Sequence, residues 1–165
     1  MAALKRQEMQ EAQLMEPIES MMQLNRILDL ISVEERLAIH AATDITGFGL
    51  LGHSQQMAQA SQKKLVFEFT QIPIFAQAME FIEKGFLTKA HRSNATYTEA
   101  PCDLTSLTAL QKLILHDPQT SGGLLLSVNA EKAPVLLQKL KTRFSKAAIV
   151  GSVTAGGSSA VEVLS

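Results

Sequence analysis

The chain has 165 residues, of which 46% are hydrophobic and 19% are charged, a balance typical of one folded domain rather than of a disordered segment. Fifteen basic and 16 acidic residues give a net charge of −1. This balance provides no overall positive field for a nucleic acid or an anionic membrane surface. We therefore expect no nucleic-acid partner.

Nothing in the sequence indicates a membrane or secreted protein. The longest apolar runs, such as GLLLSV, have the length of a strand and are far too short to span a bilayer. The first residues, MAALKRQEMQEAQ, are charged and lack the apolar centre of a signal peptide. The single Cys102 excludes an internal disulfide and a zinc site built from cysteines. Together these features predict a cytoplasmic protein without a membrane partner.

The N-terminal part of the chain is expected to be helical. Residues 1–13 read as a weakly anchored helix, and Pro17 suits the first turn of a second helix that runs to about Ile31. One face of this second helix is expected to be buried, because the following residues recur at helical spacing: Ile18, Met21, Met22, Asn25 and Leu28. A polar residue such as Asn25 on that face indicates an internal hydrogen bond.

The middle of the chain alternates between strand and helix patterns. RLAIHAATD predicts a buried strand ending at Asp44, and LLGHSQQMAQAS repeats apolar residues at helical spacing. KKLVFEFTQ alternates as a strand, and Pro73 then opens a helix that Gly85 ends as a left-handed cap. Residues 86–103 show no steady period and are expected to form a long loop, which is either functional or ordered by a partner surface.

The C-terminal part predicts a helix over 104–115, a strand over 123–128 and a helix with Asn129 as its N-cap. Two closing strands on either side of AGGSS are expected to form an antiparallel pair. The order of elements predicts an α+β fold with two layers, in which a mixed or antiparallel sheet carries helices on one face.

The stretch AATDITGFGLLGH places Asp44 where a strand ends, and Gly47 and Gly49 follow just before a helix. Free N–H groups at the start of a helix favour a phosphate, and a carboxylate beside them favours the Mg²⁺ that accompanies a nucleotide. Alternatively, Asp44 and Thr46 only cap the helix, which is a common role for such residues.

A second stretch, LHDPQTSGGLLLSV, has the same design. Asp117 precedes Pro118 in a favoured turn arrangement, and hydroxyls and glycines follow before an apolar strand. A purely turn-building role is again an alternative. Two stretches of one type favour a shared polar site.

The sequence contains no complete catalytic set. It has no P-loop, no glycine motif for dinucleotides and no nucleophile elbow. The histidines show no metal-ligand spacing, and His40 and His53 read as packed or capping residues. Cys102 has no adjacent basic group that would lower its pKa. The sequence therefore predicts half of a site, with no catalytic residue of its own.

The stretches ATDITGFGLLGH and DPQTSGGLLLSV resemble the paired signatures of the C-terminal domain of selenophosphate synthetase (selenide, water dikinase). This family belongs to a larger group that includes aminoimidazole ribonucleotide synthetase. The block DPQTSGG is the more specific of the two, and the resemblance runs over nearly the whole chain, from MMQLNR to AAIVGSV. One departure is the segment TKAHRSNATYTEA, which lacks the family's glycines and separates Arg92 from Asn94 by Ser93.

The resemblance implies an enzyme that makes selenophosphate, AMP and phosphate from ATP, selenide and water with Mg²⁺. It implies that residues 1–16 are a remnant of an interdomain linker and that residues 17–165 are the C-terminal domain. The N-terminal catalytic domain would be the partner of this chain, and the full-length protein would be a homodimer. By itself the chain would be inactive.

By the same resemblance, Asp44 would be the metal-binding carboxylate that this domain supplies. The remaining cleft-lining residues would be Thr43, Gly47, Gly49, Asp117, Thr120, Ser121 and Gly122. Two alternatives stay open: another ATP-dependent member of the same group, of the purine-synthesis, thiamine-phosphate or hydrogenase-maturation type, or a non-catalytic binding or scaffold module.

Overall fold

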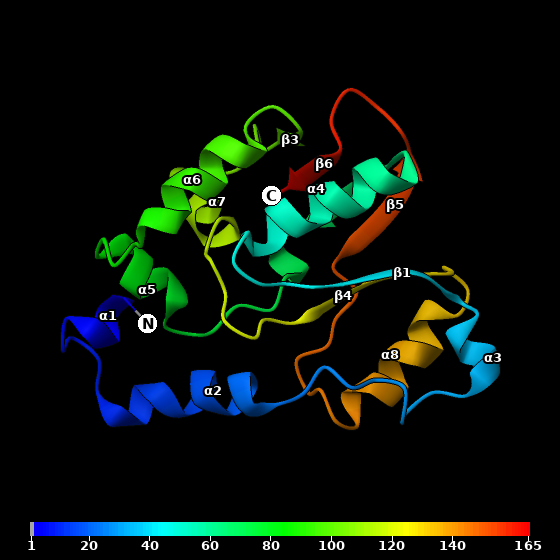
Figure 1. Cartoon of the computed structure of the whole chain (residues 1–165), viewed down its shortest axis with the longest axis horizontal. Coiled ribbons are helices and arrows are strands. Elements are labelled where there is room, and N and C mark those ends of the chain that lie inside the picture. The colour runs from blue at the N-terminus through cyan, green and yellow to red at the C-terminus, as the bar shows by residue number, and fades with distance from the viewer. Residues whose placement is uncertain (1) are drawn as a thin grey trace.

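The computed structural model describes residues 2–165, so Met1 of the expected N-terminal helix lies outside the described part (Figure 1). The helices are α1 Ala2–Lys5, α2 Glu11–Met22, α3 Val33–Arg36, α4 Gly49–Ser61, the short 3-10 helix η1 Phe69–Gln71, α5 Ala78–Glu83, α6 Lys89–Thr98, α7 Ala109–Leu115 and α8 Ala133–Lys141. The strands are β1 Ile39–Asp44, β2 Lys63–Glu68, β3 Cys102–Asp103, β4 Leu124–Val128, β5 Gly151–Ala155 and β6 Val161–Leu164.

Four strands form a mixed sheet in the order β3-β6-β2-β5. Strands β2 and β6 run parallel, whereas β2 and β5 run antiparallel. The buried face of this sheet includes Leu65 and Phe67 from β2 and the two valines of β6, and it packs in one core with residues of α4 and α7. The mixed α+β fold with helices on one face of a sheet is therefore confirmed.

The expected antiparallel pair at the C-terminus is wrong. Strands β5 and β6 do not pair, because β2 lies between them. Pairing with β2 places Val161 and Val163 inside the sheet, where they are 0% and 1% exposed. Burial of this apolar surface stabilises the observed order.

A second, two-stranded sheet joins β1 and β4 in antiparallel register, with Asp44 opposite Leu124. One face of this ribbon packs with α8 and with Ile27 and Ile31 in a separate apolar cluster, whereas Leu125 points to the main core. Strand β1 was expected to be buried, and this is wrong, because Ile39, Ala41 and Thr43 are only half-buried and His40, Ala42 and Asp44 are exposed. Because β1 pairs only with β4, it is the edge of a narrow ribbon rather than a central strand.

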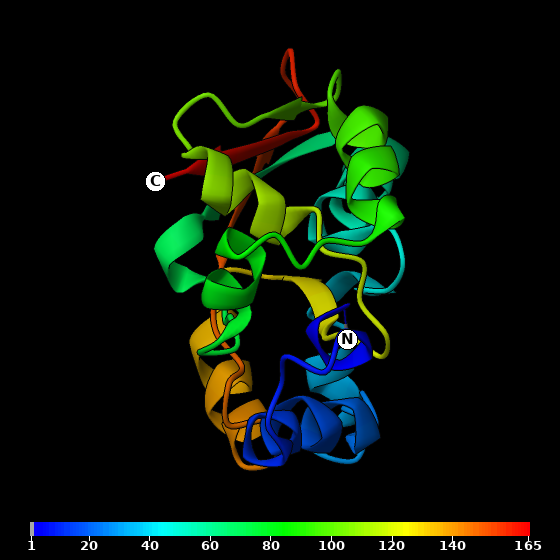
Figure 2. The ribbon, with the colours of Figure 1, turned by 90° about the vertical axis from the view of Figure 1, so that its left-hand side faces the viewer.

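Helix α2 differs from the expected helix in both bounds and burial. It begins at Glu11, ends at Met22 and contains Pro17 in its interior, where the missing N–H removes one backbone bond without ending the helix. Met22 and Leu28 are 76% and 50% exposed, so the expected buried face is not buried in the described part of the chain. Figures 1 and 2 show α2 at the end of the molecule opposite the four-stranded sheet.

The expected loop over residues 86–103 is also wrong, since most of it forms α6 and β3. Helix α6 begins after Thr88, whose N–H donates to Nδ1 of His91 at 3.2 Å. Its buried residues are His91, Asn94 and Thr98. A helix whose buried face is polar has no apolar period, and this explains why the sequence pattern did not reveal it.

Other local expectations are confirmed. Helices α4, α7 and α8 and strand β4 lie within or close to the predicted segments. Gly85 ends α5 with a φ of +80°, and the N–H of Phe86 donates to the carbonyl of Phe81 at 3.0 Å, as in a left-handed cap. Helix α5 itself is shorter than expected, because it begins at Ala78 rather than near Pro73. Among the described residues, none of the helices combines the length and apolarity that a bilayer crossing requires.

Candidate functional site

Asp44 is the last residue of β1 and is exposed, where the strand gives way to the turn that leads into α4. The side chain of Asn25 donates through Nδ2 to Oδ1 of Asp44 at 3.2 Å and to the carbonyl oxygen of Gly122 at 2.8 Å. Asn25 therefore bridges the two acid-glycine stretches. The hydrogen bond expected for Asn25 is confirmed, although the residue lies beyond the end of α2 rather than on a helix face.

The backbones of the two stretches are joined directly. The N–H of Ile45 donates to the carbonyl of Gly123 at 2.9 Å, and the N–H of Gly122 donates to the carbonyl of Ile45 at 3.1 Å. A further bond runs from the N–H of Gln119 to the carbonyl of Thr46 at 3.1 Å. The turn after Asp117 is thereby held beside the segment that follows Asp44, as two stretches sharing one site require.

A close contact between the start of α4 and the second stretch requires glycine at position 49. It has a φ of +68°, and a Cβ atom at this position would lie 2.9 Å from the carbonyl oxygen of Asp117 and 3.2 Å from that of Leu115. Only glycine combines that backbone conformation with such a close approach. At Gly47, by contrast, an added Cβ would meet nothing within 4 Å. The two glycines thus have different roles, and Gly49 brings the start of α4 against the second stretch.

The turn itself exposes hydroxyl groups. Thr120 and Ser121 are exposed, so their hydroxyls face solvent at the turn. Ser121 has a φ of +53°, a conformation that non-glycine residues seldom adopt outside functional or tightly constrained positions. A Cβ at Gly122 would collide with the carbonyl oxygen of Ile45 and the side chain of Gln119, so this glycine permits the backbone pairing described above.

Two of the expected cleft residues point elsewhere. Thr43 lies opposite Leu125 and therefore on the other face of the ribbon from Asp44, because side chains alternate along a strand. Asp117 turns toward α6, where its Oδ1 lies 3.1 Å from Nε2 of the buried His91. The structure thus brings Asp44, Asn25 and Gly122 together.

His53 lies next to the turn that follows Asp44. Nε2 of His53 lies 3.0 Å from the hydroxyl of Thr46, and burial lowers the pKa of His53 while the Asp44 carboxylate opposes this shift. Cys102 is no reactive thiolate, because burial raises its pKa to about 12.

The shifted pKa of His116 predicts that the stability of the protein depends on pH. Burial lowers the pKa of His116 below its ordinary value of 6.5; a backbone contact with Lys112 opposes the shift and nearby His91 adds to it. The unfolded chain binds a proton more readily at this ring than the folded protein does. The free energy of unfolding should therefore be highest above the unfolded pKa and should fall as the pH decreases through about 6.5.

Urea unfolding of wild type and His116→Gln at several pH values tests this expectation. The variant should lose less free energy of unfolding between about pH 7 and pH 5 than wild type does, because it lacks the titrating ring. Equal losses in both proteins would contradict a role for His116 in acid sensitivity.

The Asp44 carboxylate is suited to bind Mg²⁺ as a single protein ligand. Within residues 2–165 no three His, Cys, Asp or Glu side chains gather to hold a metal ion. Mg²⁺ needs no such cage, since it commonly takes one or two protein carboxylates and completes its shell with water and phosphate oxygens. Only Oδ1 of Asp44 accepts a hydrogen bond from the described residues, which leaves Oδ2 available to an ion.

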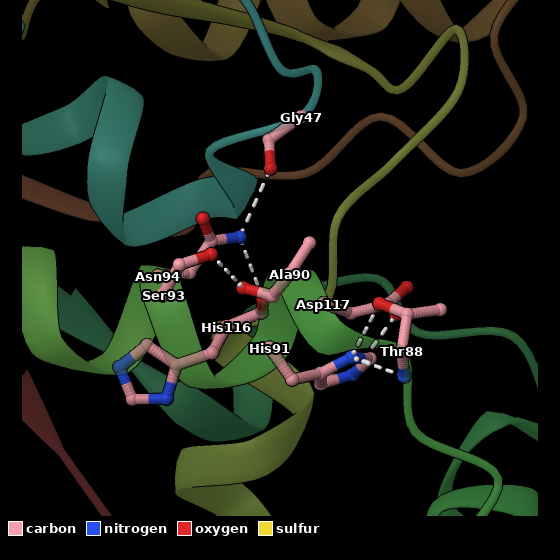
Figure 3. Close-up of polar contacts among 8 residues, drawn as sticks. All are labelled: Gly47, Thr88, Ala90, His91, Ser93, Asn94, His116 and Asp117. Atoms are coloured by element: carbon pink, nitrogen blue, oxygen red, sulfur yellow. Dashed lines mark hydrogen bonds and ion pairs between the residues drawn. The ribbon is translucent and has the colours of Figure 1, made fainter.

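Helix α6 supplies site contacts that the sequence did not reveal. Nδ2 of Asn94 donates to the carbonyl of Gly47 at 2.9 Å and to that of His116 at 3.0 Å (Figure 3). The signal available in the sequence was the spacing of His91, Asn94 and Thr98, three polar residues on one helical face.

Residues 1–164 match the family described as "AIR synthase related protein, C-terminal domain", and the chain belongs to this family. The family that the two sequence stretches resembled is thereby confirmed at the level of this domain. The match covers both acid-glycine stretches and all elements of the described fold.

Curated relatives carry a more particular name. The chain is 53% identical to "Selenide, water dikinase" of Bdellovibrio bacteriovorus over 152 residues, covering 92% of this chain and 43% of that protein. It is 51% identical to the protein of the same name from Nitrosomonas eutropha, covering 92% of this chain and 44% of the relative. The chain therefore spans less than half the length of these relatives.

A similar fold occurs in the crystal structure of hydrogenase maturation protein HypE in complex with ATP. The TM-score is 0.52 at 22% sequence identity, over 82% of this chain and 33% of HypE. At this identity the similarity concerns the fold alone.

Proposed function

We propose that this chain is the C-terminal domain of a selenide, water dikinase, which makes selenophosphate, AMP and phosphate from ATP, selenide and water. Residues 1–16 are then the linker remnant and residues 17–165 the domain. The observation that carries the proposal is the exposed Asp44 carboxylate, which Asn25 holds beside Gly122. The proposal is supported by 53% identity to a relative of that name.

In this proposal the chain supplies one side of a Mg²⁺–ATP cleft. When bound, Mg²⁺ would neutralise negative charge on the phosphates of ATP. Asp44 would hold the ion through its carboxylate, and Asn25 orients that carboxylate by donating to Oδ1. The exposed hydroxyls of Thr120 and Ser121 would face the same cleft. The other side would come from an N-terminal domain in a cytoplasmic homodimer.

The isolated chain should not turn over ATP, because the described residues gather no complete metal site. With ATP, selenide and Mg²⁺, AMP formation should stay at the non-enzymatic background. Joining the chain to the N-terminal domain should restore AMP and selenophosphate formation. AMP production by the isolated chain would refute the proposal that this chain supplies only one half of the active site.

The same joined protein separates the alternatives. A purine-synthesis, thiamine-phosphate or hydrogenase-maturation enzyme should consume ATP with its own substrate and leave selenide unused. A scaffold module should show no response to Mg²⁺–ATP in a calorimetric titration.

A further inference from the structure

Helix α6 buries three polar side chains on one face. His91, Asn94 and Thr98 are spaced three and four residues apart, and they are only 3%, 3% and 1% exposed. Buried polar groups are costly unless they are hydrogen-bonded, so the partners of these three side chains reveal what the face is for.

Asn94 lies at the centre of this face and bonds both acid-glycine stretches. Its Nδ2 donates to the carbonyl of Gly47, three residues after Asp44, and to the carbonyl of His116, next to Asp117 (Figure 3). Because one amide group spans both carbonyls, it sets the distance between the two backbones.

The other two residues hold the second stretch. Nε2 of His91 lies 3.1 Å from Oδ1 of Asp117, and Nε2 of His116 lies 2.9 Å from the hydroxyl of Thr98. Nδ1 of His91 accepts from the N–H of Thr88 at 3.2 Å, which fixes the ring at the start of α6. The partners of the buried polar face thus lie at or beside the two stretches or within α6 itself.

We propose that α6 is the element that positions the Mg²⁺–nucleotide side of this domain, with Asn94 as its main positioning residue. Asn94 does not touch Asp44, and it acts through the backbone at Gly47, which follows the metal-binding carboxylate in the chain. The expected effect of Asn94 on catalysis rests on the proposed function. Its expected effect on the packing of the two stretches can be measured in the isolated chain.

The first test is Asn94→Asp, which keeps the shape of the side chain but replaces the donor group with an oxygen facing two carbonyl oxygens. Ser93→Ala is the matched control on the same helix, because the Ser93 hydroxyl bonds only within α6, to the carbonyl of Ala90. Hydrogen exchange followed by NMR compares the amides that cross between the stretches, those of Ile45, Gln119 and Gly122, with that of Leu65 in the main sheet.

Exchange at the three crossing amides should rise about tenfold or more in Asn94→Asp, while Leu65 and the Ser93→Ala control stay at wild-type rates. If Asn94→Asp does not fold, Asn94→Ser, which introduces no charge, provides the same comparison. Unchanged crossing amides in a folded variant would overturn the proposal. So would uniform acceleration at all amides, or failure of Asn94→Ser to fold, because Asn94 would then serve stability alone.

The second test uses the chain joined to its N-terminal domain. Asn94→Asp should lower kcat about tenfold to a hundredfold and raise the Mg²⁺ concentration at half-saturation, with the KM for selenide unchanged. Wild-type kcat and Mg²⁺ dependence would overturn the positioning role. If the joined wild-type protein has no dikinase activity, the proposed function fails, and the exchange experiment still decides whether Asn94 positions the two stretches.

Discussion

Asp44→Asn, introduced into the chain joined to its N-terminal domain, is expected to lower dikinase turnover about a hundredfold or more. An amide is a much weaker Mg²⁺ ligand than a carboxylate, and the charge on the transferring phosphoryl group would be neutralised less well. The fold should remain intact, because Asp44 is exposed and the Asn oxygen still accepts the bond from Asn25.

Steady-state AMP formation and the far-UV circular dichroism of both proteins measure these two expectations. Glu68→Gln is a suitable control, since Glu68 is also an exposed carboxylate at the end of a strand and lies outside the proposed cleft. It should keep wild-type turnover. Near-normal turnover in a folded Asp44→Asn variant would remove the metal role from this residue.

Gly49→Ala is expected to destabilise the isolated chain by about 3 kcal/mol. A non-glycine residue at a φ of +68° costs about 1–2 kcal/mol, and the added Cβ would press on the carbonyl of Asp117 at 2.9 Å. Since that contact involves backbone atoms, the second stretch must shift away from α4 to relieve it.

Gly47→Ala is the matched control two residues away, because an added Cβ there meets no atom within 4 Å. Its effect on the free energy of unfolding should stay within about 0.5 kcal/mol. Urea unfolding at a pH above 7 compares both variants with wild type. Equal effects at the two glycines would contradict the close approach at Gly49.

The elements that the sequence predicted are those with strong local signals. Strand β2 alternates regularly, α4 repeats its apolar residues at helical spacing, and Gly85 marks a left-handed cap. The meeting of the two acid-glycine stretches was also expected from their shared design, and direct backbone bonds such as that from Gln119 to Thr46 confirm it.

The missed features depend on contacts between distant parts of the chain. Strand β2 separates β5 from β6, and no local pattern encodes such a strand order. The apolar residues of α2 indicated a face but not whether anything covers it, and Met22 is exposed. The sequence did not reveal helix α6, because its buried face carries polar side chains, of which Asn94 bonds to two backbone carbonyls, instead of apolar ones.

The Asn94 and Asn25 bridges belong to this second group. An asparagine carries no sign of its partner in the sequence, and here the two asparagines bond to residues that are 19 to 97 positions away. The sequence therefore predicted an internal hydrogen bond for Asn25, but not that Asn25 and Asn94 link the two stretches.

The most direct test of the central claim is a titration of the ¹⁵N-labelled chain with Mn²⁺, a paramagnetic ion that shares the preference of Mg²⁺ for carboxylate ligands. The strongest line broadening should fall on the amides of Asp44, Ile45 and Gly122, and excess Mg²⁺ should reverse it. In Asp44→Asn this broadening should vanish while the rest of the spectrum stays in place. Broadening that persists in the variant, or that centres on other carboxylates from the start, would contradict the assignment of Asp44 as the metal ligand of this domain.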